Sequence, residues 1–365
     1  MDVKSTFLNG DLQEEVYVEQ PAGFVVAGQE HKVLKLRKAL YGLHQALRAW
    51  NEKLDSTLLS FGFRRSPSEH AIYIRKKSDI QLVVGVYVDD LVITGASRSD
   101  IQKFKGEMAA AFKISDLGLL HYYLGIEVKQ KKDGISLSQG AYAVKILEKS
   151  GMAGCNPCQV PMETKLKLSK LSSEPPVADA TAYRSIVGSL RYLVNTRPDL
   201  AFAVGYVSRF LEDPREDHLV AVKHILRYIE GTKTWGVWFG RKKAEEVSLI
   251  GFSDSDYAGD VDTRKSTTGV IFFLNESPIT WQSTKQKVVA QSTCEAEYIA
   301  AANATCQALW LARVLAEVQG LEPKAPILRV DNKSAISLIK NPVLHGQSKH
   351  IEVNTTWSGS LLKQV

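Results

Sequence analysis

The run from Leu82 to Ile93 has the clearest pattern in the chain, because apolar and β-branched residues lie on both sides of two adjacent acidic residues. Residues 82–88 and 91–94 have the composition of β-strands, and the short acidic break between them is typical of a hairpin turn. The sequence therefore predicts a hairpin whose tip carries Asp89 and Asp90. Two carboxylates this close raise each other's pKa, so an ionised pair indicates either a bound divalent cation or a well-solvated turn. Taken alone, the acidic pair is better explained by a solvated turn.

Helical patterns fill the middle of the chain. Residues 182–211 and 218–230 are apolar at helical spacing, with breaks at two prolines. Two earlier prolines and the polar stretch 169–176 predict a linker or an exposed loop. The helical segment shows no catalytic group of residues, which favours a spacing or supporting role.

A strand-rich pattern begins at Val247. The expected elements are, in order, strands at 247–254, 269–274 and 278–282, a helix at about 294–318, a strand at 327–331 and a helix at 333–340. Asp254 and Asp331 end the first and fourth of these strands, and Glu297 lies in the first turn of the long helix. Each of them alone would be explained as a helix cap or a surface acid. Carboxylates that converge from separate elements on one edge of a sheet can, however, hold the metal ions used in phosphodiester cleavage.

The composition narrows the class of protein only a little. A chain of 365 residues with 44% hydrophobic residues is expected to form two or three domains. Lys and Arg number 46 against 40 Asp and Glu, and this net charge of +6 is weak evidence for a nucleic-acid partner. Basic clusters, which would either contact phosphates or simply be solvated, occur at 35–38, 64–65, 75–77, 129–132 and 241–243.

The cysteines and the hydropathy predict an intracellular protein, in the cytoplasm or the nucleus, without a membrane partner. There are four cysteines, no secretory signal, and no apolar run approaching the roughly 20 residues of a membrane span. Cys155 and Cys158 have the Cys-x-x-Cys spacing, but no second Cys or His pair follows at the spacing of a zinc finger. Cys294 and Cys306 fall on the expected long helix and are interpreted as packing residues.

Three motifs in the first part of the chain occur in a fixed order. Asp2-Val3-Lys4 lies at an expected strand end, residues 35–50 are basic with interleaved aromatic residues, and Tyr87-Val88-Asp89-Asp90 follows. Together they resemble the polymerase motifs of copia-type LTR retrotransposon polyproteins. The resemblance continues through 123–127 and 183–190 to His350, which is nearly the whole chain.

This resemblance implies an α+β fold for the first part and an α/β fold for the last. It implies a reverse transcriptase palm and thumb at 1–165, a helical connection at 166–245, and a ribonuclease H-like domain with a mixed sheet at 246–365. The order of elements after Val247 is also that of the ribonuclease H fold.

The resemblance also implies roles for residues in the palm. Asp2 and Asp89, with Asp90 assisting, would hold two Mg²⁺ ions, or Mn²⁺, that bind the nucleotide phosphates and activate the primer 3′-hydroxyl. The other expected roles are a position beneath the primer end for Tyr87 and Val88, a position near the nucleotide or template for Gln45 and Arg48, and packing for Trp50.

Asp254, Glu297 and Asp331 correspond to the nuclease motifs of the family, where they would hold metal ions in the same way. Glu295 and Glu297 point about 200° apart on a helix, so only one of them can face the sheet. Glu297 is expected there, since it precedes a stripe of small residues suited to close packing. Asp254 is preferred to Asp256 because it directly ends the apolar strand.

The implied function is DNA synthesis on an RNA template from a DNA primer and deoxynucleoside triphosphates, with degradation of the RNA in the RNA–DNA hybrid. Departures from the family lead us to expect impaired activity. No fingers subdomain precedes Asp2, whose strand we expect to fray, and His44 and Leu47 replace the usual Lys and Pro. The resemblance stops near Asn354, which we interpret as a frameshift that removes a fourth nuclease carboxylate and the last strand.

Two alternatives to an active enzyme stay open at this stage. One is a nucleic-acid-binding module without catalysis, and the other is an inert translated remnant. Salt-dependent hybrid binding without turnover would favour the first, because phosphate contacts do not require metal chemistry. The sequence gives no indication of the oligomeric state.

Overall fold

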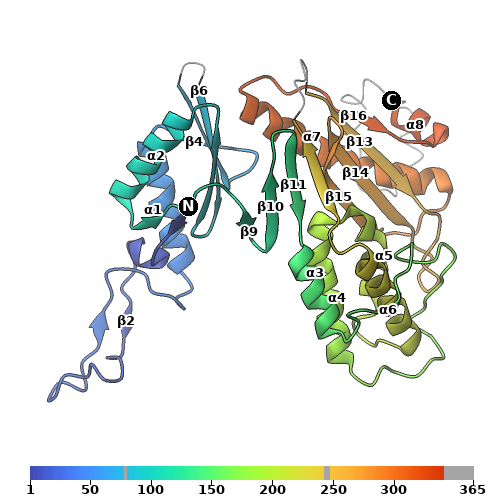
Figure 1. Ribbon diagram of the computed structural model, residues 1–365, viewed down its shortest axis with the longest axis horizontal. Helices are drawn as coiled ribbons and strands as arrows, with labels where there is room; N and C mark the ends of the chain where they lie inside the picture. Colours follow the sequence, from blue (N-terminus) through green and yellow to red (C-terminus); the bar gives the residue numbers. More distant parts are fainter. Residues whose placement is uncertain (78–79, 242–246, 341–365) are drawn as a thin grey trace. The chain divides into compact units, whose positions relative to one another are not determined.

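The computed structural model describes residues 1–77, 80–241 and 247–340 (Figure 1). They form two compact units, the first made of 1–120 with 313–322 and the second of 121–312 with the described residues from 323 onward. Segment 121–165 therefore belongs to the second unit by its contacts, while the functional domain limits at 165 and 245 stay a prediction. The change of pattern expected at Asn354 lies outside the described residues.

The first unit contains a six-stranded sheet with the order β4-β5-β6-β7-β1-β8, in which all neighbours are antiparallel. Two helices pack on it, with Leu54 and Leu58 of α1 and Phe104 and Met108 of α2 buried in a common core. The elements are β1 (Asp2–Val3), η1 (Thr6–Asn9), β2 (Tyr17–Val18), β3 (Leu34–Lys35), α1 (Ala46–Ser60), β4 (Arg64–Arg65), β5 (Ile72–Lys77), β6 (Ile80–Tyr87), β7 (Asp90–Gly95), α2 (Arg98–Ala111) and β8 (Ile114–Ser115).

The hairpin predicted at 82–94 is confirmed, but its turn lies one residue earlier than expected. Strands β6 and β7 pair as far as Tyr87 opposite Asp90. The two-residue turn is therefore Val88-Asp89, and Asp90 is the first residue of β7 rather than part of the tip. Val88 has a φ of 54°, in the left-handed region that β-branched residues rarely adopt.

Strand β1 lies inside the sheet. Asp2 is paired with Asp90 of β7 on one side and with Ser115 of β8 on the other. The terminal ammonium of Met1 also donates a hydrogen bond to the carbonyl of Leu91 at 2.8 Å. Ladders on both sides thus pair this strand in the structure, and the expected fraying stays a prediction.

The second unit combines two four-stranded sheets with a group of helices. The first sheet has the order β12-β11-β10-β9, so residues 236–240 pair with 134–138. The elements are β9 (Tyr122–Tyr123), β10 (Ile126–Gln130), β11 (Gly134–Ser138), α3 (Gly140–Lys149), α4 (Ala180–Leu193), η2 (Val194–Thr196), η3 (Pro198–Leu200), α5 (Ala201–Val207), η4 (Ser208–Phe210), α6 (Glu216–Gly231), β12 (Gly236–Gly240), β13 (Leu249–Ser255), β14 (Thr267–Leu274), β15 (Ser277–Lys285), α7 (Thr293–Gln319), β16 (Ile327–Arg329) and α8 (Lys333–Lys340). Residues 313–319 of α7 are counted with the first unit.

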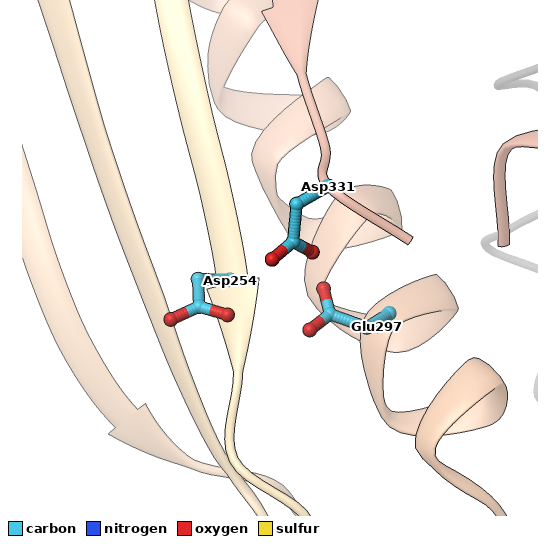
Figure 2. Close-up of side chains that lie close together, drawn as sticks. All are labelled: Asp254, Glu297 and Asp331. Atoms are coloured by element: carbon cyan, nitrogen blue, oxygen red, sulfur yellow. The ribbon is translucent and has the colours of Figure 1, made fainter. Parts of the chain in front are cut away.

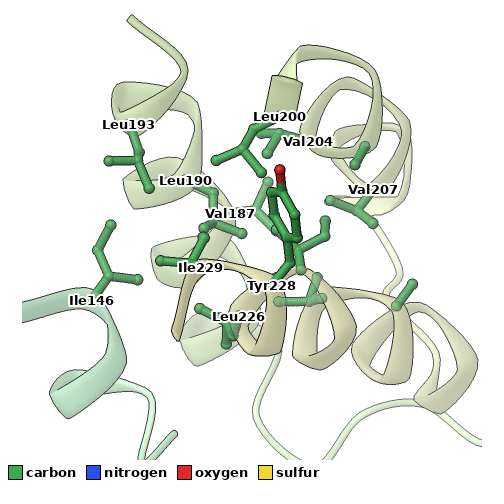
Figure 3. Packing of buried hydrophobic residues seen from close by; sticks show 14 of the residues in the cluster. Ile146, Val187, Leu190, Leu193, Leu200, Val204, Val207, Leu226, Tyr228 and Ile229 are labelled. Carbon is green, nitrogen blue, oxygen red and sulfur yellow. The ribbon is translucent and has the colours of Figure 1, made fainter. Parts of the chain in front are cut away.

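Helices α3 to α6 share one apolar core, which confirms the helical prediction for the middle of the chain. Figure 3 shows Ile146 of α3, Leu190 of α4, Val204 of α5 and Ile229 of α6 turned toward one another. The stretch 169–176 is an irregular loop, as expected. It is tied to α6, since the hydroxyl of Ser172 donates to Asp217 at 2.9 Å and the carbonyl of Ser169 lies 3.0 Å from Nε2 of buried His218.

The last sheet has the order β15-β14-β13-β16 and follows the strand and helix order expected from Val247 onward. Strands β13 and β16 are parallel and the other neighbours are antiparallel. Helix α7 packs on this sheet through a stripe of buried small residues, namely Ala301, Ala304, Ala308 and Ala312. Small side chains allow a close approach, and this stripe fixes which face of α7 meets the strands.

One described helix, α7, is long and apolar enough to cross a membrane by length and composition alone. In its most apolar window, 44% of the residues are buried inside the protein. The core of the last sheet therefore accounts for much of the apolar character of this helix.

Candidate active sites

The first acidic group lies in the first unit, where β1 meets the β6–β7 hairpin. Asp2 and Asp90 are direct partners across the paired strands, and the carbonyl of Asp89 accepts a hydrogen bond from the Val3 N–H at 3.0 Å. Burial, followed by the charges of Asp89 and Asp2, raises the pKa of Asp90 above its usual value. Residues far apart in sequence thus bring three carboxylates to one end of the sheet.

These three carboxylates are not gathered as tightly as a preformed metal cluster. The side chain of Asp2 forms an ion pair with Lys4, whose side chain is half-exposed. Within the described ranges, one group of three His, Cys, Asp or Glu residues has ligand atoms that all lie within 4.8 Å of one another, and that group lies in the second unit. The first site therefore brings a cation, Lys4, against one of its acids.

Trp50 supports the hairpin turn. Its indole Nε1–H donates to the carbonyl of Val88 at 2.7 Å, and its ring is buried edge-on against Phe112. The expectation that Trp50 packs is confirmed. Tyr87 and Val88, expected beneath the primer end, are exposed at this turn and free of the apolar core.

A cavity of about 730 Å³ lies beside the turn. Arg48, Trp50 and Val88 line it, together with Arg65 and His70. Arg48 is exposed and paired with Glu52 one helical turn away. Gln45, which directly precedes α1, is half-buried and does not line this cavity, and its expected place near the nucleotide or template stays a prediction.

The second acidic group lies in the second unit and consists of Asp254, Glu297 and Asp331. Figure 2 shows them converging from β13, from the first turns of α7 and from the segment that follows β16, which ends at Arg329, two residues before Asp331. Their ligand oxygens all lie within 4.8 Å of one another. Asp254 and Asp331 are exposed, whereas Glu297 is only 6% exposed.

Glu297 is the electrostatically strained member of this triad. Its Oε1 accepts a hydrogen bond from the Ser255 N–H at 3.2 Å, but its buried Oε2 has no hydrogen-bond partner among the described residues. Burial first, and then the charges of Asp254 and Asp331, raise its pKa to about 7, and the Ser255 bond offsets this only in part. A buried acceptor without a donor, facing two further carboxylates, is suited to a cation.

The neighbouring acids have structural partners instead. Asp256 accepts from the Thr267 N–H at 2.7 Å and so closes the loop after β13. Glu295 accepts from the Gln291 N–H at 2.8 Å, at the start of α7. The geometry therefore brings Asp254 rather than Asp256, and Glu297 rather than Glu295, into the triad, as the sequence predicted.

Sequence reasoning missed Gln286. This buried residue follows β15, and its amide donates to the Ser255 hydroxyl at 3.1 Å and to the Ala296 carbonyl at 2.9 Å. It thereby ties together the strand that carries Asp254 and the helix that carries Glu297. Nothing in the local sequence distinguishes it from any polar residue after a strand.

Comparison with known proteins decides the family. The reverse transcriptase (RNA-dependent DNA polymerase) family matches residues 1–164. The chain is 43% identical over 98% of its length to the retrovirus-related Pol polyprotein from transposon TNT 1-94 of Nicotiana tabacum, and 41% identical over 97% to that from transposon RE1 of Arabidopsis thaliana. It is 36% identical to a transposon Ty5-1 protein of Saccharomyces cerevisiae, with 82% of this chain and 98% of that protein covered. The chain belongs to the Pol polyproteins of copia-type retrotransposons.

This Pol chain spans about a quarter of the length of the TNT 1-94 and RE1 polyproteins. Both acidic groups of the Pol chain supply carboxylate oxygens, the ligands that Mg²⁺ prefers. The donor set therefore fits that ion. The unpartnered Oε2 of Glu297 makes the case strongest for the triad.

Proposed function

We propose that this Pol chain carries an RNA-directed DNA polymerase site in its first unit and a ribonuclease H site for RNA–DNA hybrids in its second. The observation that carries the proposal is the joint presence, in a chain of this family, of the Asp2–Asp90 pairing and the triad of Asp254, Glu297 and Asp331. Two acidic groups on separate sheets correspond to two separate phosphodiester chemistries.

In the polymerase site, Asp2, Asp89 and Asp90 would hold the metal ions. Tyr87 and Val88 would contact the primer end from the exposed turn, and Trp50 would fix that turn from below through its bond to the Val88 carbonyl. Arg48 would meet the template in the cavity beside the turn, and Gln45 would lie near the nucleotide. Lys4 would have to release Asp2 when a divalent cation binds, because both compete for the same carboxylate.

In the nuclease site, Asp254, Glu297 and Asp331 would hold the metal ions at the edge of a ribonuclease H-like sheet. The mixed sheet β15-β14-β13-β16 with α7 packed on it supports this assignment. In the metal-free site Glu297 would bind or release a proton near neutral pH, since burial and the neighbouring carboxylates raise its pKa to about 7. When bound, Mg²⁺ ions, or Mn²⁺ in their place, would activate the attacking oxygen and stabilise the leaving oxygen in both sites.

The substrates of the proposed function are an RNA template, a DNA primer, deoxynucleoside triphosphates and the RNA–DNA hybrid. The positive net charge of +6 is consistent with such partners, since phosphate contacts supply sequence-independent affinity. An intracellular setting without a membrane partner is part of the same proposal.

The test is primer extension on a labelled RNA template with Mg²⁺, read for new DNA and for shortened RNA in one reaction. We expect Asp89→Asn to abolish DNA synthesis alone and Asp254→Asn to abolish RNA cleavage alone, because the acids belong to different units. Asp133→Asn, at an exposed loop acid, is the matched control. Activities unchanged by both substitutions would contradict the assignments, and hybrid binding without turnover would favour a non-catalytic binding module.

A further inference from the structure

The sheet β12-β11-β10-β9 carries a row of residues that runs across three of its strands. Lys129 of β10 is paired with Ser136 of β11, and Ser136 is paired in turn with Trp238 of β12. Directly paired residues point to the same face of a sheet, so the lysine and the indole lie on either side of a short serine side chain. Residues far apart in the sequence thus share one face.

The indole of Trp238 packs on backbone rather than on another side chain. A Cβ atom at Gly134 would lie 2.5 Å from Cζ2 and 2.9 Å from Cε2 of the ring. Gly134 is paired with Gly240, so the positions next to the ring carry no side chain. Trp238 is nevertheless 40% exposed, and among the described residues it pairs with no aromatic ring and no cation. Part of the ring is therefore open to a ligand.

Cations gather beside this ring at the end of the sheet. The turn between β10 and β11 carries Lys131 and Lys132. Arg241 directly follows β12, and its N–H donates to the carbonyl of Asp133 in that turn at 2.7 Å. The three cations are exposed and form no ion pair within the described part of the chain. The structure thus joins basic clusters that are far apart in the sequence.

This group of cations keeps an excess of positive charge. The ammonium of Lys129 lies 3.8 Å from Glu127, and an exposed pair at that distance contributes little. The other oxygen of Glu127 accepts the Ala141 N–H at 2.8 Å, at the start of α3. Asp133 is the second acid at this end of the sheet. Four cations therefore lie beside two acids.

An exposed ring with cations beside it is suited to an unpaired nucleic-acid strand. Bases of a single strand stack on aromatic side chains while the phosphates contact cations, and this stacking tolerates every base. A paired duplex would offer only its backbone here, because its bases are already stacked inside it. The RNA template supplies an unpaired strand among the substrates of the proposed function.

We propose that this basic-aromatic face binds an unpaired stretch of the RNA template. A base would stack on Trp238, and the neighbouring phosphates would contact Lys129, Lys131, Lys132 and Arg241. This role rests on the proposed function and deepens it, since it names where the single-stranded part of the template is held. The face contains no member of either acidic group, so binding requires no metal ion.

The test measures binding of the full chain to a labelled, unstructured RNA of about 12 nucleotides by fluorescence anisotropy in EDTA. We expect Trp238→Ala to weaken binding about tenfold, because stacking of one base is lost. Trp238→Phe should retain most of the affinity, since a ring remains. Phe24→Ala, at an exposed aromatic residue of the first unit, is the control and should match the parent chain.

A salt titration of the same binding tests the cations. Replacing Lys131 and Lys132 together by Ala should reduce the slope of log affinity against log salt by about 1.4, because each phosphate contact with a single strand contributes about 0.7. Replacing Lys103 and Lys145 together by Ala is the matched control, since both are exposed on helices outside this sheet, and it should leave the slope unchanged.

The outcomes separate this face from the proposed catalysis. Unchanged RNA binding in Trp238→Ala would overturn the assignment, even if the parent chain extends primers and cleaves hybrids. An equal loss of binding to a fully paired hybrid, or tighter binding of single-stranded DNA of the same sequence, would also overturn it. A parent chain that binds RNA through Trp238 but shows no turnover with Mg²⁺ would support the face and refute the proposed function. Circular dichroism and the Trp238→Phe variant distinguish loss of stacking from loss of folding.

Discussion

Replacing Glu297 by Gln removes a buried negative charge while keeping the size of the side chain. The amide oxygen can still accept from the Ser255 N–H, and the new NH₂ group can donate to the carboxylates of Asp254 or Asp331. Glu297 is only 6% exposed, and its Oε2 has no hydrogen-bond partner among the described residues. When no divalent cation is bound, nothing therefore compensates its negative charge. The substitution should therefore stabilise the metal-free protein, which is unusual for a change in a proposed active site.

The magnitude follows from the pKa. The protein raises the pKa of Glu297 from 4.5 to about 7, and each pKa unit corresponds to about 1.4 kcal/mol. The free energy of unfolding should thus fall by up to about 3 kcal/mol as pH rises from the unfolded pKa to the folded one, because the unfolded chain loses its proton first. The titrations of three adjacent carboxylates are coupled, so we expect about 1–3 kcal/mol for the single substitution.

The assay is urea unfolding in EDTA at about pH 5 and about pH 8.5, on either side of the pKa of Glu297. Glu297→Gln should match the parent chain at the lower pH and exceed it at the higher pH. Glu295→Gln is the control, because Glu295 is also nearly buried but accepts from the Gln291 N–H outside the triad. A variant that is less stable at high pH, or a difference independent of pH, would refute the reasoning.

Three further predictions concern other parts of the chain. Trp50→Phe removes the donor to the Val88 carbonyl and should cost about 1–3 kcal/mol of unfolding free energy and lower primer extension, as measured by urea unfolding and gel assay. Arg209→Ala removes one of two cations beside buried Asp260 and should destabilise the chain by about 2 kcal/mol. Despite burial, hydrogen bonds and Lys285 hold the pKa of Asp260 at about 2, so the stability that its carboxylate contributes is lost as pH falls from 3.8 to 2. Because Arg209→Ala starts from a lower stability, it should unfold at a higher pH in an acid titration. Gly251→Ala places a methyl group against the ring of Phe272, which packs on β13, and should therefore lower the thermal unfolding midpoint.

The strands and helices that position the triad could be predicted because each has a local signal. The apolar run that ends at Asp254, the small-residue stripe after Glu297 and the strand before Asp331 are all visible in the sequence. Helix geometry allowed only one of Glu295 and Glu297 to face the sheet, the small-residue stripe and the family motif favoured Glu297, and the structure places Glu297 in the triad. Periodicity was sufficient here because one face of each element is buried.

Other features depend on contacts between distant segments, which no local pattern reveals. The bond from Trp281 to Val194 and the ion pair of Arg209 with Asp260 join residues far apart in the chain, and together they anchor the segment around α5 to the last sheet. The pairing of Asp2 on both sides was likewise hidden, because a two-residue strand has no periodicity to read.

The turn at Val88 shows why the acidic tip was placed one residue too late. Local rules favour Asp over Val in a turn, yet here Val88 takes the left-handed conformation and Asp90 enters the strand. Left-handed backbone at a β-branched residue costs free energy and persists only where the surroundings impose it. The buried indole of Trp50 binds the Val88 carbonyl and so supports this turn. The turn makes Asp90 the first residue of β7, and the separate ladder between β7 and β1 then brings Asp90 opposite Asp2. The first site therefore depends on two registers, neither of which a local turn rule can predict.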